Sequence, residues 1–184
     1  MVAAGAAAIL ALVIGAAIGR SIIPSPSPQR VQPAHFEDPL VGIALTYPGT
    51  WRKLQSTDPQ VLLLAARGRS RSLQLRVTKS DLENVKQETL PVVRQFTDEL
   101  LAEDKRAKML SPPTAISLGG LLGYRYRYTY AAADNSTGAH VHYFLFKGSR
   151  LIQLVFQAVP ATSLAAAEPT FERIAATVRS SGGR

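Results

Sequence analysis

Hydrophobic and polar residues alternate most regularly between Leu121 and Gln157, in three runs separated by turn residues. In the first run, from Tyr124 to Tyr130, an aromatic residue stands at every second position, which is typical of a strand whose two faces have different surroundings. The second run covers residues 139–146 and the third covers residues 151–158. Small polar residues and glycine fill both connections and favour turns. The pattern therefore predicts an antiparallel β-meander, around which we expect the fold to be organised.

The turn at Gly148 predicts which residues of the meander share a face. If Lys147 pairs with Arg150 across this turn, Leu145 lies opposite Ile152, and the resulting aliphatic face is expected to be core. The other face mixes aromatic rings with hydrogen-bonding groups, and an even register in the first hairpin adds its tyrosines to this face. The candidate contact residues on it are Tyr126, Tyr128, His140, His142, Gln153 and Gln157. Two uses of this face remain open: a helix or loop that covers it and satisfies its polar groups, or a ligand groove.

Shorter patterns on either side of the meander predict further strands and two helices. The predicted strands before the meander cover residues 42–47, 61–66 and 73–79. An apolar stripe that begins beside Pro91 predicts a helix that continues past Lys105 and is broken at Pro112 and Pro113. A last helix is predicted to place Phe171, Ile174 and Val178 on one face. The fold class is thus α+β, with an antiparallel sheet of about six strands flanked by helices.

The start of the chain has a different composition. Residues 2–19 are an unbroken run of Ala, Val, Ile, Leu and Gly, which as a helix would extend about 27 Å, close to the ~30 Å hydrocarbon core of a bilayer. We therefore predict a transmembrane anchor at residues 1–19, with a cleaved signal peptide as the alternative. Residues 20–35 are rich in proline and serine and predict an extended linker. The folded domain is then expected over residues 36–181, followed by a disordered tail at residues 182–184.

Composition narrows the classes of partner. The chain has a net charge of +8 and no cysteine, which excludes disulfides, thiolate catalysis and cysteine metal sites. Excess positive charge attracts polyanions, and because of the predicted membrane segment we expect anionic lipid or cell-envelope polymers instead of nucleic acid. The densest basic cluster is a turn with Arg67, Arg69 and Arg71, whose guanidinium groups suit phosphate and carboxylate. Its alternative role is to protect a strand edge from aggregation.

No pattern in the chain predicts catalysis. No serine lies in a Gly-x-Ser-x-Gly or Ser-x-x-Lys motif, and the carboxylates Asp98 and Glu99 are neighbours on a predicted helix instead of facing each other across a cleft. His140 and His142 point to the same side of one strand, where a third ligand such as His35 would be needed to hold a metal. Two ligands do not make a metal site, so we predict neither a metal nor another cofactor.

Two motifs at the ends of the predicted domain carry a resemblance to a known family. The first consists of Phe36, Gly42 to Leu45, Tyr47, Pro48 and Trp51, and the second of Pro169, Phe171, Ile174 and Arg179. They are similar to the opening and closing motifs of the PsbP-like family, which includes extrinsic proteins of the photosynthetic oxygen-evolving complex, Ran-binding relatives and secreted bacterial domains. The resemblance covers roughly residues 36–180. It implies an α/β/α sandwich that works as a docking or ligand-binding module without a common chemistry.

These observations together give a prediction of function. We expect a non-catalytic bacterial module of the cell envelope, anchored as a single-pass membrane protein with its domain outside the cytoplasm, or secreted if the leader is cleaved. It would bind a protein or another envelope component through the face that carries Tyr128 and His142. The alternative is a small-molecule or lipid carrier with a pocket between sheet and helix.

Overall fold

The computed structural model describes residues 32–39, 42–131 and 136–180, and all of them belong to one compact unit, Val31–Arg184. The predicted anchor, most of the predicted linker and the tail lie outside the described residues. Within the described part, no helix is long and apolar enough to cross a membrane. The first strand begins at Pro33, so the last residues of the predicted linker are already part of the sheet structure.

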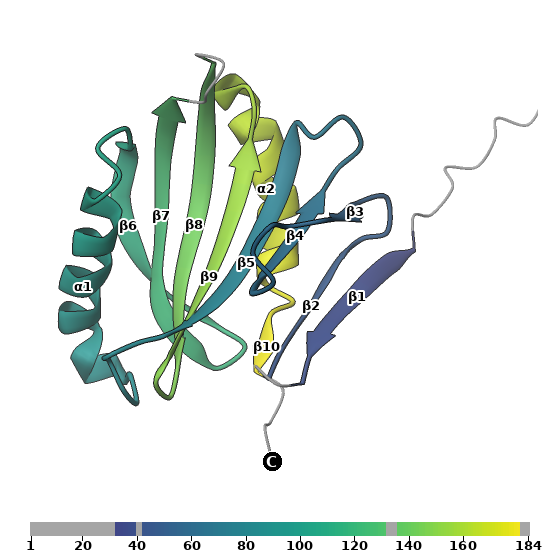
Figure 1. The fold of residues 1–184 in the computed structure, drawn as a ribbon. Coiled ribbons are helices and arrows are strands. Elements are labelled where there is room, and N and C mark those ends of the chain that lie inside the picture. Colours follow the sequence, from purple (N-terminus) through teal and green to yellow (C-terminus); the bar gives the residue numbers. More distant parts are fainter. Residues whose placement is uncertain (1–31, 40–41, 132–135, 181–184) are drawn as a thin grey trace, which may run out of the picture. The chain divides into compact units, whose positions relative to one another are not determined.

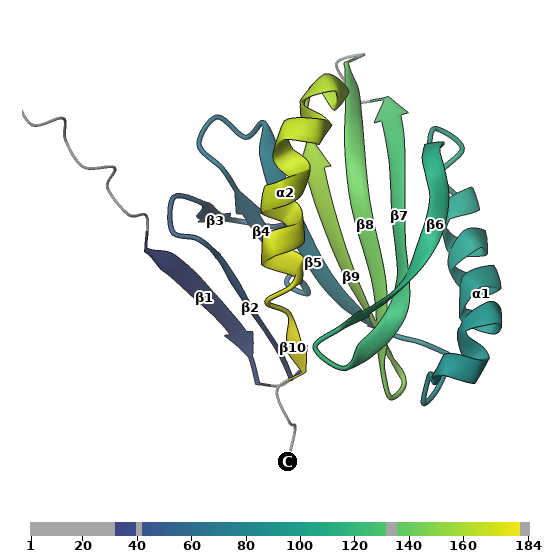
Figure 2. The ribbon, with the colours of Figure 1, turned by 180° about the vertical axis from the view of Figure 1, so that it is seen from behind.

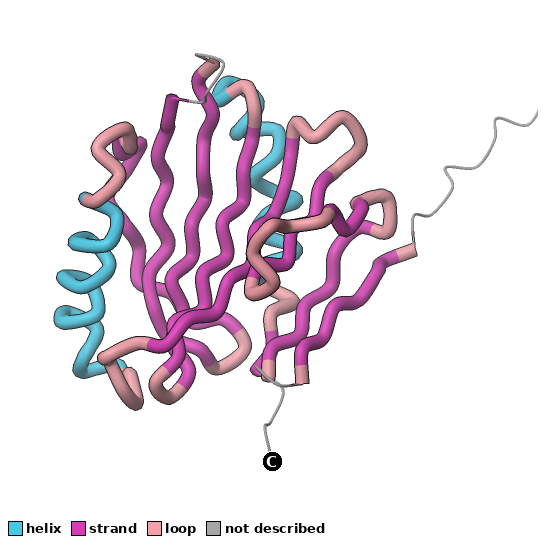
Figure 3. Tube along the Cα trace, viewed as in Figure 1, coloured by secondary structure: helices cyan, strands magenta, loops and turns pink. Residues whose placement is uncertain are grey.

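Two helices and two antiparallel sheets form the described part of the chain (Figures 1 and 3). The strands are β1 (Pro33–Asp38), β2 (Ile43–Pro48), β3 (Arg52–Leu54), β4 (Val61–Ala65), β5 (Arg71–Lys79), β6 (Lys108–Leu118), β7 (Leu121–Ala131), β8 (Thr137–Lys147), β9 (Arg150–Ala158) and β10 (Arg179–Ser180). The α-helices are α1 (Leu90–Ala102) and α2 (Leu164–Ala175), each preceded by a 3-10 turn at Gln87–Thr89 and Ala161–Ser163. The large sheet has seven strands in the order β3-β4-β5-β9-β8-β7-β6, and the small sheet has the order β1-β2-β10. The predicted α+β class is confirmed.

Strands β7, β8 and β9 form the predicted meander. Leu145 lies opposite Ile152, as the turn at Gly148 predicts. In the first hairpin Tyr126 lies opposite His142, so the tyrosines and histidines share one face of the sheet. Because side chains alternate along a strand, a tight turn of fixed length sets the face of every residue that follows it.

The back face of the large sheet forms the main core with α2, which crosses it in Figure 2. The Phe171 ring of α2 is fully buried and stacks on the Phe156 ring of β9, with 5.0 Å between the ring centroids. Ile43 of β2 is also fully buried in this core, so the small sheet closes it from one side. Val178 follows α2 instead of lying on it, as α2 ends at Ala175, but its side chain is fully buried.

The front face carries a second, smaller core under α1. Leu90 and Val93 of α1 are buried with five aromatic residues of β7 and β8, which are Tyr124, Tyr126, Tyr128, Phe144 and Phe146. α1 lies over this half of the sheet only (Figure 1). Leu151 at the start of β9 is also buried in this core, but neither described helix covers the front of β4, of most of β5 or of the rest of β9.

The region between α1 and β7 differs from the prediction. The predicted helix continues past Lys105, whereas α1 ends at Ala102 and the chain then forms β6. Pro112 and Pro113, which the pattern marks as helix breakers, lie inside β6. β6 is an edge strand, and its register with β7 shifts on both sides of Ser111. Edge strands and bulges tolerate proline because the missing N–H is not needed for the ladder, so two prolines conceal this strand in the sequence.

Candidate functional site

The six predicted contact residues lie on the front face of β7, β8 and β9, but they are not equally accessible. Three of them are buried: Tyr126 is 1% exposed, Tyr128 is 5% exposed and His142 is 7% exposed. The other three are half-buried: His140, Gln153 and Gln157. A partner can therefore reach only the second group without displacing the groups that cover the first.

Tyr126 fastens α1 to the sheet. Its hydroxyl donates a hydrogen bond to Asp98 Oδ1 at 2.7 Å and lies 2.6 Å from Thr97 Oγ1, and both partners are on α1. Arg94 Nε holds the other carboxylate oxygen of Asp98 at 2.7 Å. Burial raises the pKa of Tyr126 well above its ordinary value, so the hydroxyl keeps its proton for this donation. These hydrogen bonds therefore hold α1 on the front face of the large sheet.

Tyr128 joins the two histidines. Its hydroxyl lies 3.1 Å from His140 Nδ1 and 3.3 Å from His142 Nδ1. His140 Nε2 donates to Gln157 Oε1 at 3.4 Å, so His140 Nδ1 is the acceptor of the single Tyr128 proton. His142 Nδ1 must then donate to the Tyr128 oxygen, and the lone pair of its Nε2 has no hydrogen-bond partner among the described residues.

Both histidines are neutral at pH 7 in this arrangement. Burial lowers the pKa of His142 to about 3, with a further lowering from His140 and an opposing effect from Gln153. Burial also lowers the pKa of His140. No group of three or more metal-binding side chains is assembled in the described ranges. His35, the suggested third ligand, lies on β1 of the small sheet and its Nδ1 is 3.0 Å from Thr46 Oγ1.

The uncovered half of the front face extends the accessible residues into a larger surface. One row across the strands runs from β3 to β8 through Arg52, Ala65, Ser72, Gln157 and His140, of which Ala65 is buried and the others are half-buried or exposed. The next row consists of Leu54, Leu63, Gln74 and Val155. Gln74 is exposed, and the three apolar residues of its row are half-buried. We call these two rows the open front face. Sequence reasoning missed its β3, β4 and β5 residues because only the pairing of β5 with β9 brings them beside the meander.

The basic turn lies at the tip of the β4–β5 hairpin. Arg67 and Arg69 are exposed and Arg71 is half-buried. No described acidic residue forms an ion pair with any of the three. Arg52 lies opposite Ala65 of β4, so its backbone is close to this tip. The turn is therefore a solvated patch of positive charge at one end of the large sheet.

Two arginines of β7 do not extend this patch. Arg125 Nη1 pairs with Glu172 at 2.9 Å and Arg127 Nη2 pairs with Glu168 at 2.8 Å, both on α2. β7 is separated from β5 by β8 and β9. These two arginines therefore hold α2 on the back face.

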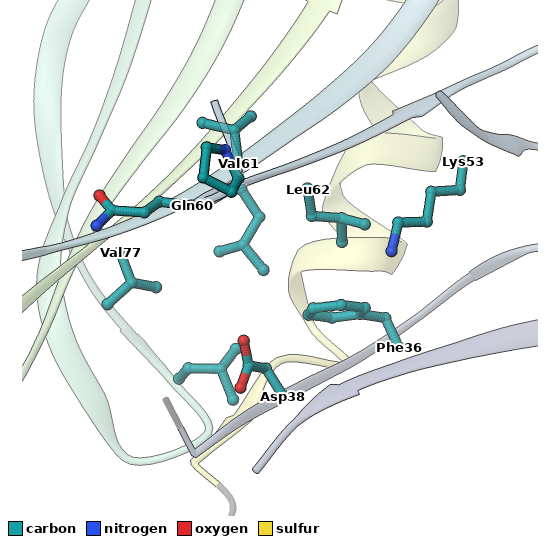
Figure 4. A pocket seen from close by; sticks show the side chains of 10 residues that line it. Phe36, Asp38, Lys53, Gln60, Val61, Leu62 and Val77 are labelled. Carbon is teal, nitrogen blue, oxygen red and sulfur yellow. The ribbon is translucent and has the colours of Figure 1, made fainter. Parts of the chain in front are cut away.

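A pocket of about 370 Å³ lies between the small sheet and the β3–β5 end of the large sheet (Figure 4). Phe36 and Ile43 form one wall, and Leu62 and Leu75 form the other. A second hollow of about 300 Å³ lies between α1 and β6 and is lined by charged residues such as Asp104. The interval between the large sheet and α2 is filled by the main core.

The similarity of this chain to known proteins is found in the fold and not in the sequence. No family model matches the sequence, and no curated protein matches it. Among solved structures, cyanobacterial PsbP (CyanoP) from Synechocystis sp. PCC 6803 matches with a TM-score of 0.59 and 14% identity, over 82% of this chain and 93% of that chain. LpqN of Mycobacterium tuberculosis, a protein involved in cell envelope biogenesis, matches with a TM-score of 0.52 and 18% identity, over 80% and 88%. The Saccharomyces cerevisiae Ran-binding protein Mog1p matches with a TM-score of 0.51 and 11% identity, over 82% and 96%.

The lengths and identities limit what these matches mean. A protein from Bacteroides thetaiotaomicron also matches, but this chain spans only 47% of its length. At such low identities, structural similarity establishes the fold but does not transfer the partner of one protein to another. The resemblance found in the sequence is confirmed at this level: the chain has the PsbP-like fold that CyanoP, LpqN and Mog1p share.

Proposed function

We propose that this protein is a non-catalytic binding module that docks a partner protein on the open front face. The observation that carries the proposal is the unequal cover of the sheet: α1 buries the β7–β8 half, while the other half has no helix over it in the described structure. Leu63 and Val155 are only half-buried there, and Gln74 is exposed. A partner would complete the burial of these aliphatic side chains and accept or donate hydrogen bonds at the amides.

The charge of the surface favours an acidic partner. Arg52 is exposed at the β3 end of the row that also contains His140, and the basic turn lies close to it. Arg76 follows Gln74 by two residues on β5; it pairs with Asp58 at 3.2 Å, and both of these side chains remain substantially exposed. Complementary charge speeds the encounter of two proteins and disfavours wrong partners. Mog1p is a Ran-binding protein, which by analogy supports a protein partner for this fold.

The location belongs to the same proposal. Residues 2–19 would anchor the chain in a membrane, the linker would hold the domain away from it, and the domain would work outside the cytoplasm. The involvement of LpqN in cell envelope biogenesis supports a partner in the envelope. The basic turn with Arg67 and Arg69 would then lie within reach of anionic lipid.

Site-specific photo-crosslinking of the full chain in its own membrane tests this proposal. A photoreactive amino acid at Gln74 is expected to capture a discrete partner protein. The same amino acid at Gln95, an exposed glutamine on α1, is the matched control and should capture none. Capture at Gln95 alone, or no capture at Gln74, would overturn the open front face as the docking surface.

The second candidate function is that of a carrier for a small molecule. The pocket of about 370 Å³ favours it, although this pocket lies between the two sheets and not between sheet and helix.

A further inference from the structure

The pocket between the two sheets has the size and lining of a ligand site. Its apolar walls come from separate parts of the chain: Phe36 lies on β1 and Leu62 on β4 (Figure 4), and Leu75 of β5 also lines the pocket. These walls leave about 370 Å³ between them, within the ~300–1,000 Å³ that is usual for small-molecule pockets. Leu62 and Leu75 are 7% and 4% exposed, whereas Phe36 and Val77 are half-buried, so an apolar ligand of matching size would gain contacts mainly with the last two.

Two charged groups stand at the edge of these walls. Figure 4 shows the Asp38 carboxylate and the Lys53 amino group turned toward the pocket. Asp38 already has an interaction partner within the protein. Lys53 forms no ion pair with any described acidic residue and is exposed. The Lys53 ammonium is therefore a positive group at this pocket that no described carboxylate pairs with.

We propose that this pocket binds a small amphiphile with one apolar chain and one anionic head group. The chain lies among Phe36, Leu62 and Leu75, and the head group stays at the solvent edge, where it pairs with the Lys53 ammonium. A carboxylate or a phosphate fits this role, since both accept hydrogen bonds from an ammonium group. This inference rests on the carrier function and is independent of the open front face, because Leu62 and Leu75 lie on the back face of the large sheet and Phe36 lies on the small sheet.

A photoreactive fatty acid tests the proposal with the full chain in nanodiscs of neutral lipid. The probe is an eight-carbon carboxylic acid that carries a diazirine near the end of its chain, and mass spectrometry locates the labelled peptides. We expect labelling of the strands that carry Phe36, Leu62 and Leu75. Octanoate should compete with the probe about tenfold better than octanol or octylamine, because only octanoate places a negative charge beside Lys53. Equal competition by octylamine would refute the anionic head group.

Two variants test the residues, and a third serves as the matched control for the loss of charge. Lys53→Met keeps the aliphatic stem and removes the charge, so labelling should fall about tenfold, whereas Lys79→Met, at an exposed lysine that does not line the pocket, should leave it unchanged. Val77→Phe fills the pocket from a half-buried position and should abolish labelling. Unchanged labelling in both pocket variants would overturn the proposal, as would labelling that maps elsewhere. Crosslinking at Gln74 should be the same in Lys53→Met, which separates this site from the docking surface.

Discussion

The hydroxyl of Tyr126 is expected to contribute measurably to the stability of the domain. Tyr126→Phe removes one oxygen from a residue that is 1% exposed, and with it the hydrogen bonds to Asp98 and Thr97. A hydrogen bond to a charged group contributes about 1.5–3 kcal/mol. Thr97 keeps its bond to the Val93 carbonyl oxygen at 2.9 Å, and Asp98 is partly exposed and keeps Arg94, so neither partner is left without a bond. We therefore expect the lower end, a loss of about 1.5 kcal/mol in the free energy of unfolding.

Urea denaturation followed by circular dichroism measures this loss, and thermal unfolding should show a midpoint lower by about 3–6 °C for a domain of this size. Tyr124→Phe is the matched control. It removes the same atom from the same face of β7, but the Tyr124 hydroxyl has no hydrogen bond to any described residue, so its loss should stay under about 0.5 kcal/mol. Equal losses in the two variants would refute the idea that this hydroxyl fastens α1 to the sheet.

Three further predictions concern the meander and its two cores. Because burial depresses the pKa of His142, the unfolded state binds more protons than the folded state between about pH 3 and pH 6.5. Through His142, the free energy of unfolding should therefore fall by about 1.3 kcal/mol from pH 7 to pH 5.5, as measured by urea denaturation at a series of pH values. In His142→Phe the free energy of unfolding should depend less on pH in this range, and an unchanged dependence would contradict the prediction. Phe171→Ala removes the ring that stacks on Phe156 and should cost about 3–5 kcal/mol, seen as a large drop in the thermal midpoint. Gly123→Ala would push a Cβ atom into the Phe144 carbonyl oxygen, so it should destabilise the pairing of β7 with β8. Unchanged stability of this variant in urea would contradict the close approach of the two strands at Gly123.

Local patterns predicted the meander well because its information is local. The turn at Gly148 is short, so it fixed the pairing of Leu145 with Ile152 and the faces of β8 and β9. The sequence also identified the front-face residues correctly, but their burial depends on α1, whose position over β7 and β8 is a tertiary matter. Of the predicted contact residues, His140 and the two glutamines of β9 remain within reach of a partner.

The parts that the sequence did not reveal depend on contacts between distant segments. β10 pairs Arg179 with Ala44, which is far away in the sequence. A strand of 2 residues is too short to produce a periodic pattern of hydrophobic and polar residues. The pocket between the sheets needs Phe36, Lys53 and Leu75 side by side, which only the packing of the two sheets achieves. The predicted helix near residue 108 failed for a different reason, because prolines in an edge strand resemble a helix stop.

The affinity of the captured partner for two matched double variants tests the docking surface most directly. Arg52→Glu with Gln74→Glu changes the open front face, and Lys86→Glu with Gln95→Glu makes equivalent charge changes at exposed positions before and on α1. Both full-length variants should fold, since all four side chains are exposed. We predict at least about tenfold weaker binding for the first variant and a change within about twofold for the second. Equal affinity of the two variants would contradict docking on the open front face.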